Sequence, residues 1–128
     1  MKYKCVIIDD EELARELLED HLVHFPELEL VGSFASAIAA RQFDFTQADL
    51  LFLDIEMPVL KGTDFFKHLH PKPAVIFTTA YRDYAIEGFD LAAVDYLLKP
   101  ITFQRFYKAI ERFLGAQILP SNPSVSNS

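Results

Sequence analysis

The chain has 128 residues, of which 51% are hydrophobic, which is enough for one packed domain and too short for two of ordinary size. Its formal net charge of -7 argues against direct nucleic-acid binding, because phosphate recognition depends on clustered Lys and Arg. No run approaches the roughly 18 consecutive apolar residues of a membrane span, and no secretion signal opens the chain. The single cysteine, Cys5, cannot form a disulfide within the chain. We therefore expect a soluble, cytoplasmic protein without a membrane or direct nucleic-acid partner.

Segments with strand-like and helix-like patterns alternate along the chain. Apolar runs rich in branched and aromatic residues predict buried strands at residues 4–8, 28–34, 50–53, 74–78 and 94–98. The intervening and final segments predict helices at residues 11–24, 36–43, 63–69, 84–89 and 103–114. This alternation predicts an α/β fold with a doubly wound, five-stranded parallel sheet of the flavodoxin-like (βα)5 type and strand order 2-1-3-4-5.

The composition changes after Gly115, where Ser, Asn and Pro dominate. Such a segment cannot bury enough apolar area to order itself. We therefore expect one domain over residues 1–115 and a flexible tail, or the start of a linker, over residues 116–128.

Polar side chains follow four of the predicted strands, namely Asp9 with Asp10, then Asp54, Thr79 and Lys99. The carboxyl ends of parallel strands share one edge of a sheet, so these side chains are expected to meet at one site. The acids and the lysine also have ordinary structural explanations. Acids favour helix N-termini, Asp is common in turns, and a lysine before proline can simply end a strand.

Three carboxylates packed together repel one another unless a cation lies among them, and Mg²⁺ suits a site with so few protein ligands. A carboxylate beside a metal and a lysine can attack phosphorus and form an aspartyl phosphate. Lys99 would neutralise the phosphoryl oxygens and Thr79 would donate a hydrogen bond to them. The sequence thus predicts a magnesium-dependent phosphoryl-acceptor site at Asp54. An X-Pro bond can be cis at modest cost, and we predict a cis bond between Lys99 and Pro100.

Four motifs occur in order: Ile8-Asp9-Asp10-Glu11, Leu53-Asp54-Ile-Glu-Met57-Pro58 leading to Gly62, Thr78-Thr79-Ala80, and Asp95-Tyr96-Leu-Leu-Lys99-Pro100. With these motifs, residues 3–115 resemble the receiver domain of bacterial two-component response regulators. The resemblance implies that Asp54 accepts a phosphoryl group from a sensor histidine kinase. It also implies that the chain is not an enzyme but a phosphoacceptor that assists its own phosphorylation and dephosphorylation.

The resemblance further assigns the metal ligands and the moving parts. Asp10 and Asp54 would bind Mg²⁺ directly, Asp9 would act mainly through water, and Glu56 would contribute its backbone carbonyl. The Thr79 hydroxyl would move toward the phosphoryl oxygens while the ring of Tyr96 turns inward.

Two further positions flank the phosphoryl site in such domains, Glu56 and Tyr81, and they tune access of water. We hypothesise that the bulky Tyr81 slows hydrolysis of the aspartyl phosphate. The stretches Phe77-Thr-Thr-Ala-Tyr81, Tyr84-Ala-Ile and Ala92-Ala-Val-Asp-Tyr96 look most like receivers that precede LytTR-type DNA-binding domains. Such a receiver would control transcription through an output domain that this sequence lacks.

Two surfaces are candidates for partners. Cations on the last predicted helix face acids on the fourth predicted helix and fifth strand, and these charges can pair within one subunit or across a two-fold axis. The residues are Arg105, Lys108, Arg112, Asp83, Glu87, Asp90 and Asp95. We predict a phosphorylation-promoted homodimer through this face, although surface ion pairs are individually weak. The first predicted helix carries more apolar residues than one buried stripe needs, namely Leu13, Ala14, Leu17 and Leu18, so part of that surface can meet the kinase's helices.

Two other classes of function fit parts of the pattern. One is a magnesium-dependent aspartyl phosphatase or phosphotransferase that uses Asp54 on an external substrate, although Glu56 stands where a second general-acid aspartate would be expected. The other is a stand-alone module that acts by protein–protein interaction.

Overall fold

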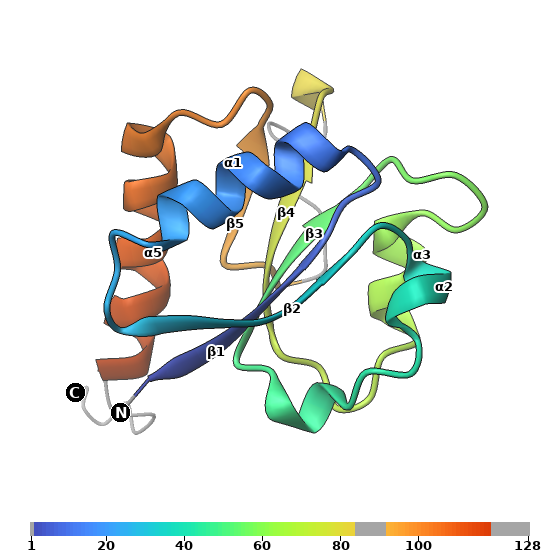
Figure 1. Ribbon diagram of the computed structural model, residues 1–128, viewed down its shortest axis with the longest axis horizontal. Helices are drawn as coiled ribbons and strands as arrows, with labels where there is room; N and C mark the ends of the chain where they lie inside the picture. Colours follow the sequence, from blue (N-terminus) through green and yellow to red (C-terminus); the bar gives the residue numbers. More distant parts are fainter. Residues whose placement is uncertain (1, 84–91, 119–128) are drawn as a thin grey trace.

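The computed structural model describes residues 2–83 and 92–118 (Figure 1). Its strands form one parallel sheet of order β2-β1-β3-β4-β5, which confirms the predicted flavodoxin-like α/β fold. The strands are β1 (Tyr3–Ile8), β2 (Leu28–Phe34), β3 (Leu50–Asp54), β4 (Ala74–Thr79) and β5 (Asp95–Leu98). The helices are α1 (Glu12–Leu22), α2 (Ala37–Ala40), α3 (Gly62–Lys67) and α5 (Phe103–Ile118), with a 3₁₀ turn at Phe45–Gln47.

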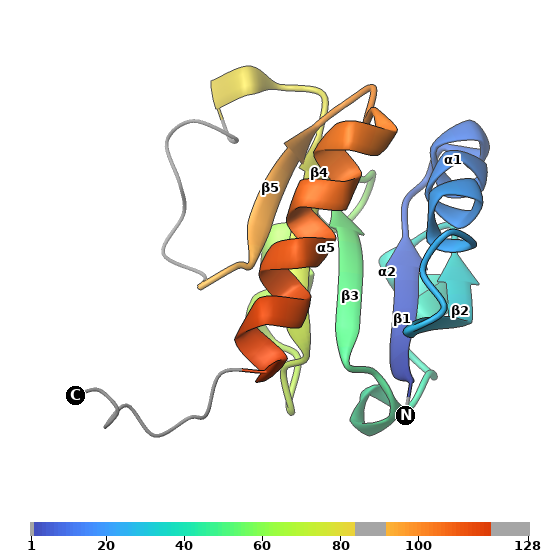
Figure 2. The ribbon, with the colours of Figure 1, turned by 90° about the vertical axis from the view of Figure 1, so that its left-hand side faces the viewer.

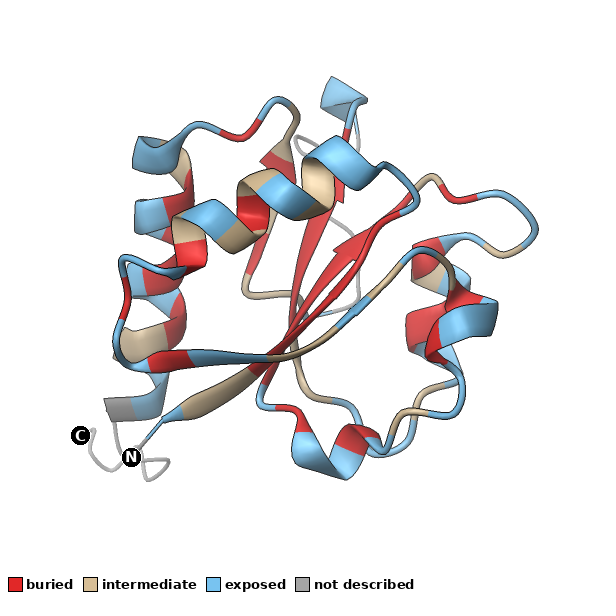
Figure 3. Ribbon diagram, viewed as in Figure 1, coloured by how far each residue is buried: buried red, intermediate tan, exposed pale blue. Residues whose placement is uncertain are grey.

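Helices cover both faces of the sheet. Helices α1 and α5 lie over one face, and α2 and α3 lie over the other (Figures 1 and 2). Alternate strand residues point to opposite faces, so Phe52 packs with Phe106 toward α5, while Phe77 packs with Phe66 toward α3. The central strands are buried along their length (Figure 3). The continuous apolar runs seen in the sequence therefore reflect burial on both faces.

Local side-chain caps explain where α2 and the 3₁₀ turn begin. The Ser36 hydroxyl accepts a hydrogen bond from the Ala39 backbone N–H over 3.0 Å, which satisfies a free donor of α2. The Asp44 carboxylate does the same for Thr46 at the 3₁₀ turn, with a distance of 3.1 Å. This turn was not predicted from the sequence, because only its capping residue marks it.

The last helix is longer than the sequence predicts. It runs through Gly115 and ends at Ile118, beyond the expected domain boundary. Glycine in a helix costs about 1 kcal/mol relative to alanine, which the good helix formers Ala116 and Gln117 help to offset. The predicted helix at residues 84–89 and the remaining tail, residues 119–128, lie outside the described residues. Among the described residues, no helix is both long and apolar enough to cross a membrane.

Candidate functional site

The predicted acidic residues meet at the carboxyl edge of the sheet. Asp9 follows β1 and Asp54 ends β3, and both are buried, while Asp10 is exposed. Carboxylate oxygens of Asp9, Asp10 and Asp54 all lie within 4.8 Å of one another, the one such cluster of potential metal ligands in the described part of the chain. Parallel topology brings Asp54 to the other two although more than forty positions separate it from them in sequence.

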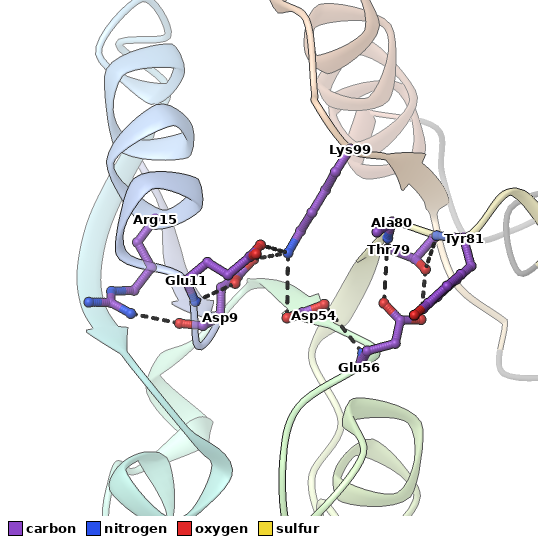
Figure 4. Close-up of polar contacts among 9 residues, drawn as sticks. All are labelled: Asp9, Glu11, Arg15, Asp54, Glu56, Thr79, Ala80, Tyr81 and Lys99. Atoms are coloured by element: carbon purple, nitrogen blue, oxygen red, sulfur yellow. Dashed lines mark hydrogen bonds and ion pairs between the residues drawn. The ribbon is translucent and has the colours of Figure 1, made fainter.

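The ammonium group of Lys99 lies among these acids (Figure 4). Its Nζ is 3.0 Å from Asp9 Oδ2, 2.8 Å from Glu11 Oε1 and 3.5 Å from Asp54 Oδ2. Burial disfavours the charged form, but the hydrogen bonds to Glu11 and Asp9 and the charges of Asp9 and Asp54 outweigh it, so the pKa of Lys99 is raised. The lysine is therefore a permanent cation. The peptide bond between Lys99 and Pro100 is cis, as expected from the sequence.

The Asp54 carboxyl is buried, with 2% of its side chain exposed. Burial and then the charge of Asp9 raise the pKa of Asp54 to about 8, while Lys99 opposes this shift. One ammonium group is thus too little positive charge for the carboxylates around it. A further cation at this place would lower the pKa of Asp54 and so favour its ionised form.

The residues present fit a magnesium ion. All donors are carboxylate oxygens, the hard ligands that Mg²⁺ prefers. Asp9 Oδ2 is buried, and its contact within the described residues is with the Lys99 ammonium, 3.0 Å away. Opposite ligands of Mg²⁺ lie about 4.2 Å apart, since each is about 2.1 Å from the ion. Carboxylate oxygens that all lie within 4.8 Å of one another are therefore close enough to share one Mg²⁺ ion.

Backbone contacts hold the two buried acids in place. Asp9 Oδ1 accepts a hydrogen bond from the Glu11 N–H over 2.9 Å, and Asp54 Oδ1 accepts one from the Glu56 N–H over 3.3 Å. A side chain at Gly62 would collide with the Asp54 carbonyl oxygen, so glycine is required for this close approach of α3 to the end of β3. The loop between β3 and α3 is thus packed directly against the backbone of Asp54.

On the other side of Asp54, the Thr79 hydroxyl is bonded to Glu56. Thr79 Oγ1 donates to Glu56 Oε2 over 2.7 Å and accepts a hydrogen bond from the Tyr81 N–H over 3.0 Å. The Ala80 N–H lies 3.4 Å from Glu56 Oε1. Figure 4 shows Glu56 between Asp54 and these residues of β4 and its following turn. A cavity of about 190 Å³ here is lined by Asp10, Glu11, Asp54, Glu56, Ala80, Tyr81 and Lys99.

Sequence reasoning placed most of these residues but missed two contacts. Glu11 was read only as part of an acidic helix start, and the Glu56 side chain was not expected to bond Thr79. Glu11 stands next to the predicted cluster, a position from which a partner for Lys99 could have been proposed. Nothing in the sequence marks the direction of the Glu56 side chain.

Tyr96 lies on β5, outside the immediate site. It pairs with Phe77 of β4, and the two rings stack with centroids 5.4 Å apart. Helix α5 is tied to β5, because Asp95 of β5 forms ion pairs with Arg105 over 2.7 Å and with Arg112 over 2.8 Å. These α5 cations therefore pair within one subunit. Glu87 and Asp90, the acids expected on the same face, lie outside the described residues.

Comparison with known proteins decides the family. The model of the response regulator receiver domain matches residues 5–111. The chain belongs to this family. The receiver domain is 42% identical over 112 residues to the transcriptional regulatory protein BtsR of Salmonella typhi, with 85% of this chain and 47% of that protein aligned. It is 38% identical over 113 residues to an uncharacterized response regulatory protein of Vibrio cholerae, with 86% of this chain and 48% of that protein aligned.

Solved structures agree with this assignment. The response regulatory domain of protein mrkE from Klebsiella pneumoniae superimposes with a TM-score of 0.75 at 33% identity, covering 88% of this chain and 96% of that one. The REC domain of AraT from Geobacillus stearothermophilus gives a TM-score of 0.77 at 28% identity, covering 91% and 97%. The receiver domain spans about half the length of the curated relatives it matches. Receiver domains are in general phosphoacceptors that bind Mg²⁺ at an acidic pocket and interact with histidine kinases.

Proposed function

We propose that Asp54 accepts a phosphoryl group from a sensor histidine kinase and that Thr79 and Tyr96 pass this change to an output domain. The observation that carries the proposal is the position of the Asp54 carboxylate, buried at the end of β3, in the acidic cluster and 3.5 Å from the Lys99 ammonium. This is the minimum set for phosphoryl transfer, which needs positioning and neutralisation of charge more than covalent chemistry.

In the proposed reaction, a carboxylate oxygen of Asp54 attacks phosphorus. The phosphorus–nitrogen bond to the donor histidine breaks, and the imidazole leaves and takes up a proton. Lys99, held by Glu11 and Asp9, stabilises charge on the phosphoryl oxygens. Mg²⁺, when bound by Asp10, Asp54, the Glu56 carbonyl and Asp9 through water, would neutralise phosphoryl charge and keep Asp54 ionised.

The switch is proposed as a pre-existing equilibrium that the phosphoryl group biases. The Thr79 hydroxyl would turn toward a phosphoryl oxygen, and Tyr96 would move into the space left behind. The stacking of Tyr96 on Phe77, two residues before Thr79, supports a link between these two positions.

The output is proposed to be transcriptional. The relatives are about twice as long as the chain, and one of them is named a transcriptional regulatory protein. We propose that residues 1–115 form the receiver domain and that residues 116–128 lead to a LytTR-type DNA-binding domain in a longer cytoplasmic protein. Control of that domain would make the receiver act on DNA only indirectly, since its own charge of -7 disfavours DNA contact.

Two surfaces are proposed to meet partners. A groove of about 360 Å³ between α1 and the turn after β5 is lined by apolar residues that include Leu13, Leu17 and Ile101, and we assign it to helices of the kinase. The face of the fourth helix, β5 and α5 is proposed to form a homodimer on phosphorylation. Sedimentation of the protein with and without a phosphate mimic checks the dimer, and a monomer under both conditions would exclude it.

Tyr81 is proposed to slow loss of the phosphoryl group. Its side chain is 59% exposed and lines the cavity beside Asp54, where it can restrict the approach of water. Tyr81→Ala is expected to shorten the lifetime of the phosphorylated protein, measured after removal of the donor. An unchanged lifetime would reject this role.

One experiment separates the candidate functions. The protein is incubated with Mg²⁺ and acetyl phosphate, and its intact mass is compared with that of Asp54→Asn. A receiver gains one phosphoryl group that the variant does not gain. Continuous release of phosphate from the donor would indicate a phosphatase, and an unchanged mass would indicate a module that acts only by protein–protein interaction.

A further inference from the structure

The carboxylate of Glu56 accepts hydrogen bonds from two donors at the end of β4, next to Asp54. The Thr79 hydroxyl donates to Glu56 Oε2 over 2.7 Å, and the Ala80 N–H donates to Glu56 Oε1 over 3.4 Å. A threonine hydroxyl has one proton. As long as the Glu56 contact persists, Thr79 has no proton to donate to another oxygen.

Thr79 is also held from the opposite direction. Its oxygen accepts a hydrogen bond from the Tyr81 N–H over 3.0 Å, and the residue is fully buried. Both the donor and an acceptor position of the hydroxyl are therefore used. A turn of this side chain toward Asp54 would break the bond to Glu56, which is short and charge-assisted and thus among the stronger kinds.

Glu56 lies where its carboxylate can compete with a phosphoryl group on Asp54 for the Thr79 hydroxyl and the Ala80 N–H. Its backbone N–H donates to Asp54 Oδ1 over 3.3 Å, and its side chain lines the same cavity of about 190 Å³ as Asp54, Ala80 and Lys99. Its carboxylate offers two negatively charged acceptor oxygens, which is also what a phosphoryl group offers. Two anions in one small cavity repel each other, so addition of a phosphoryl group favours departure of the half-buried Glu56 side chain.

We infer that Glu56 is an internal competitor of the phosphoryl group, whose carboxylate binds Thr79 and the Ala80 N–H while Asp54 is unmodified and must be displaced for the switch. This inference rests on the proposed function above and adds a regulatory residue to it. Glu56 acts as a positioning residue for Thr79. It biases the protein toward the inactive arrangement by contacts that exist only in that arrangement.

The test uses beryllium fluoride with Mg²⁺ as the probe of the acceptor site, with the dissociation constant measured by isothermal titration calorimetry. Glu56→Ala frees the donors and is expected to tighten binding about tenfold, the scale of one charge-assisted hydrogen bond. Glu56→Gln keeps an oxygen that can accept from Thr79 and is expected to give a smaller gain. Asp64→Asn removes a negative charge from the exposed side of α3, outside the Thr79 network, and is expected to change nothing.

Repeating the Glu56 substitutions in a Thr79→Val variant separates competition for the Thr79 hydroxyl from simple charge repulsion between Glu56 and the probe. In Thr79→Val, which lacks the hydroxyl, the gain from Glu56→Ala is expected to shrink severalfold. Equal gains for Glu56→Ala and Glu56→Gln that persist in Thr79→Val would overturn the inference, as would the absence of any gain. If Glu56→Ala does not fold, the Glu56→Gln gain is compared in the same two backgrounds, and equal gains there overturn it as well.

The outcome for the proposed function is read separately. If the unmodified protein binds no beryllium fluoride and gains no phosphoryl group from acetyl phosphate, the acceptor function itself fails. If it does both and the Glu56 variants behave like the unmodified protein, only the competitor role fails.

Discussion

The two faces of the sheet are built differently. The face under α1 and α5 is covered by helices of 11 and 16 residues and packs large rings such as Phe52 and Phe106 against each other. Over the opposite face, the described part of the chain places α2 and α3, helices of 4 and 6 residues. That second face also holds Tyr96 and the glycine that abuts Asp54. We therefore expect truncations under α1 and α5 to cost more stability, and changes on the other face to act more strongly on the site.

Truncation of a ring on the α5 face should have the largest effect on stability. Phe106 is fully buried and contacts Phe52, Phe25 and His21. Phe106→Ala is expected to lower the free energy of unfolding by about 3–5 kcal/mol, because it leaves a cavity among these rings. Denaturant unfolding measures this. Phe66→Ala on the other face is the matched variant, and a larger loss there than for Phe106→Ala would contradict the comparison.

Two glycine substitutions, one beside Asp54 and one in α5 away from the site, form a matched pair. Gly62→Ala should destabilise by about 1–3 kcal/mol, since its methyl group meets the Asp54 carbonyl oxygen and the backbone must shift. Uptake of phosphoryl from acetyl phosphate should slow with it. Gly115→Ala has nothing within 4 Å and should instead stabilise α5 by about 1 kcal/mol. Equal behaviour of the two variants in unfolding and in uptake would show that α3 does not constrain the acceptor.

The two adjacent threonines at the end of β4 should have smaller effects on the free energy of unfolding, and these effects should have opposite signs. The hydroxyl of Thr78 is buried without a hydrogen-bond partner in the described part of the chain, whereas that of Thr79 is bonded twice. Thr78→Val is therefore expected to raise the free energy of unfolding by about 1 kcal/mol, because it removes the cost of an unsatisfied polar group. Thr79→Val should lower it. Thermal unfolding of both variants checks the pair, and a loss in Thr78→Val would reveal a partner for its hydroxyl.

The smallest expected effect concerns the lone thiol on the α5 face. Burial, with a lesser contribution from the charge of Asp49, raises the pKa of Cys5 to about 12. Because the folded protein favours the neutral thiol, this contribution to stability is complete below pH 9 and is lost as pH rises toward 12. At pH 8 a disulfide reagent should modify Cys5 only at the rate of unfolding. Rapid modification of the folded protein would mean that this face opens locally.

The sequence predicts which residues come together at the site better than it predicts which side chains contact each other. The acids and the lysine were placed correctly because each follows an apolar run, and parallel topology then requires their convergence. The partners of Lys99 and Thr79 depend on side-chain directions that no periodic pattern encodes, so the contact of Glu11 with Lys99 and that of the Glu56 side chain with Thr79 were missed. The end of α5 was misplaced for a related reason. Gly115 is a common stop signal, but here nothing crowds it and helix-forming residues follow.

One backbone hydrogen bond between β4 and the end of β5 connects Thr79 and Lys99, two residues of the site. The Lys99 N–H donates to the Thr79 carbonyl over 2.7 Å at the end of the ladder between β4 and β5. The residue with the ammonium group and the residue with the hydroxyl are thus tied through their main chains. A shift of the Thr79 backbone would therefore act directly on the neighbouring strand, which also carries the stacked ring of Tyr96.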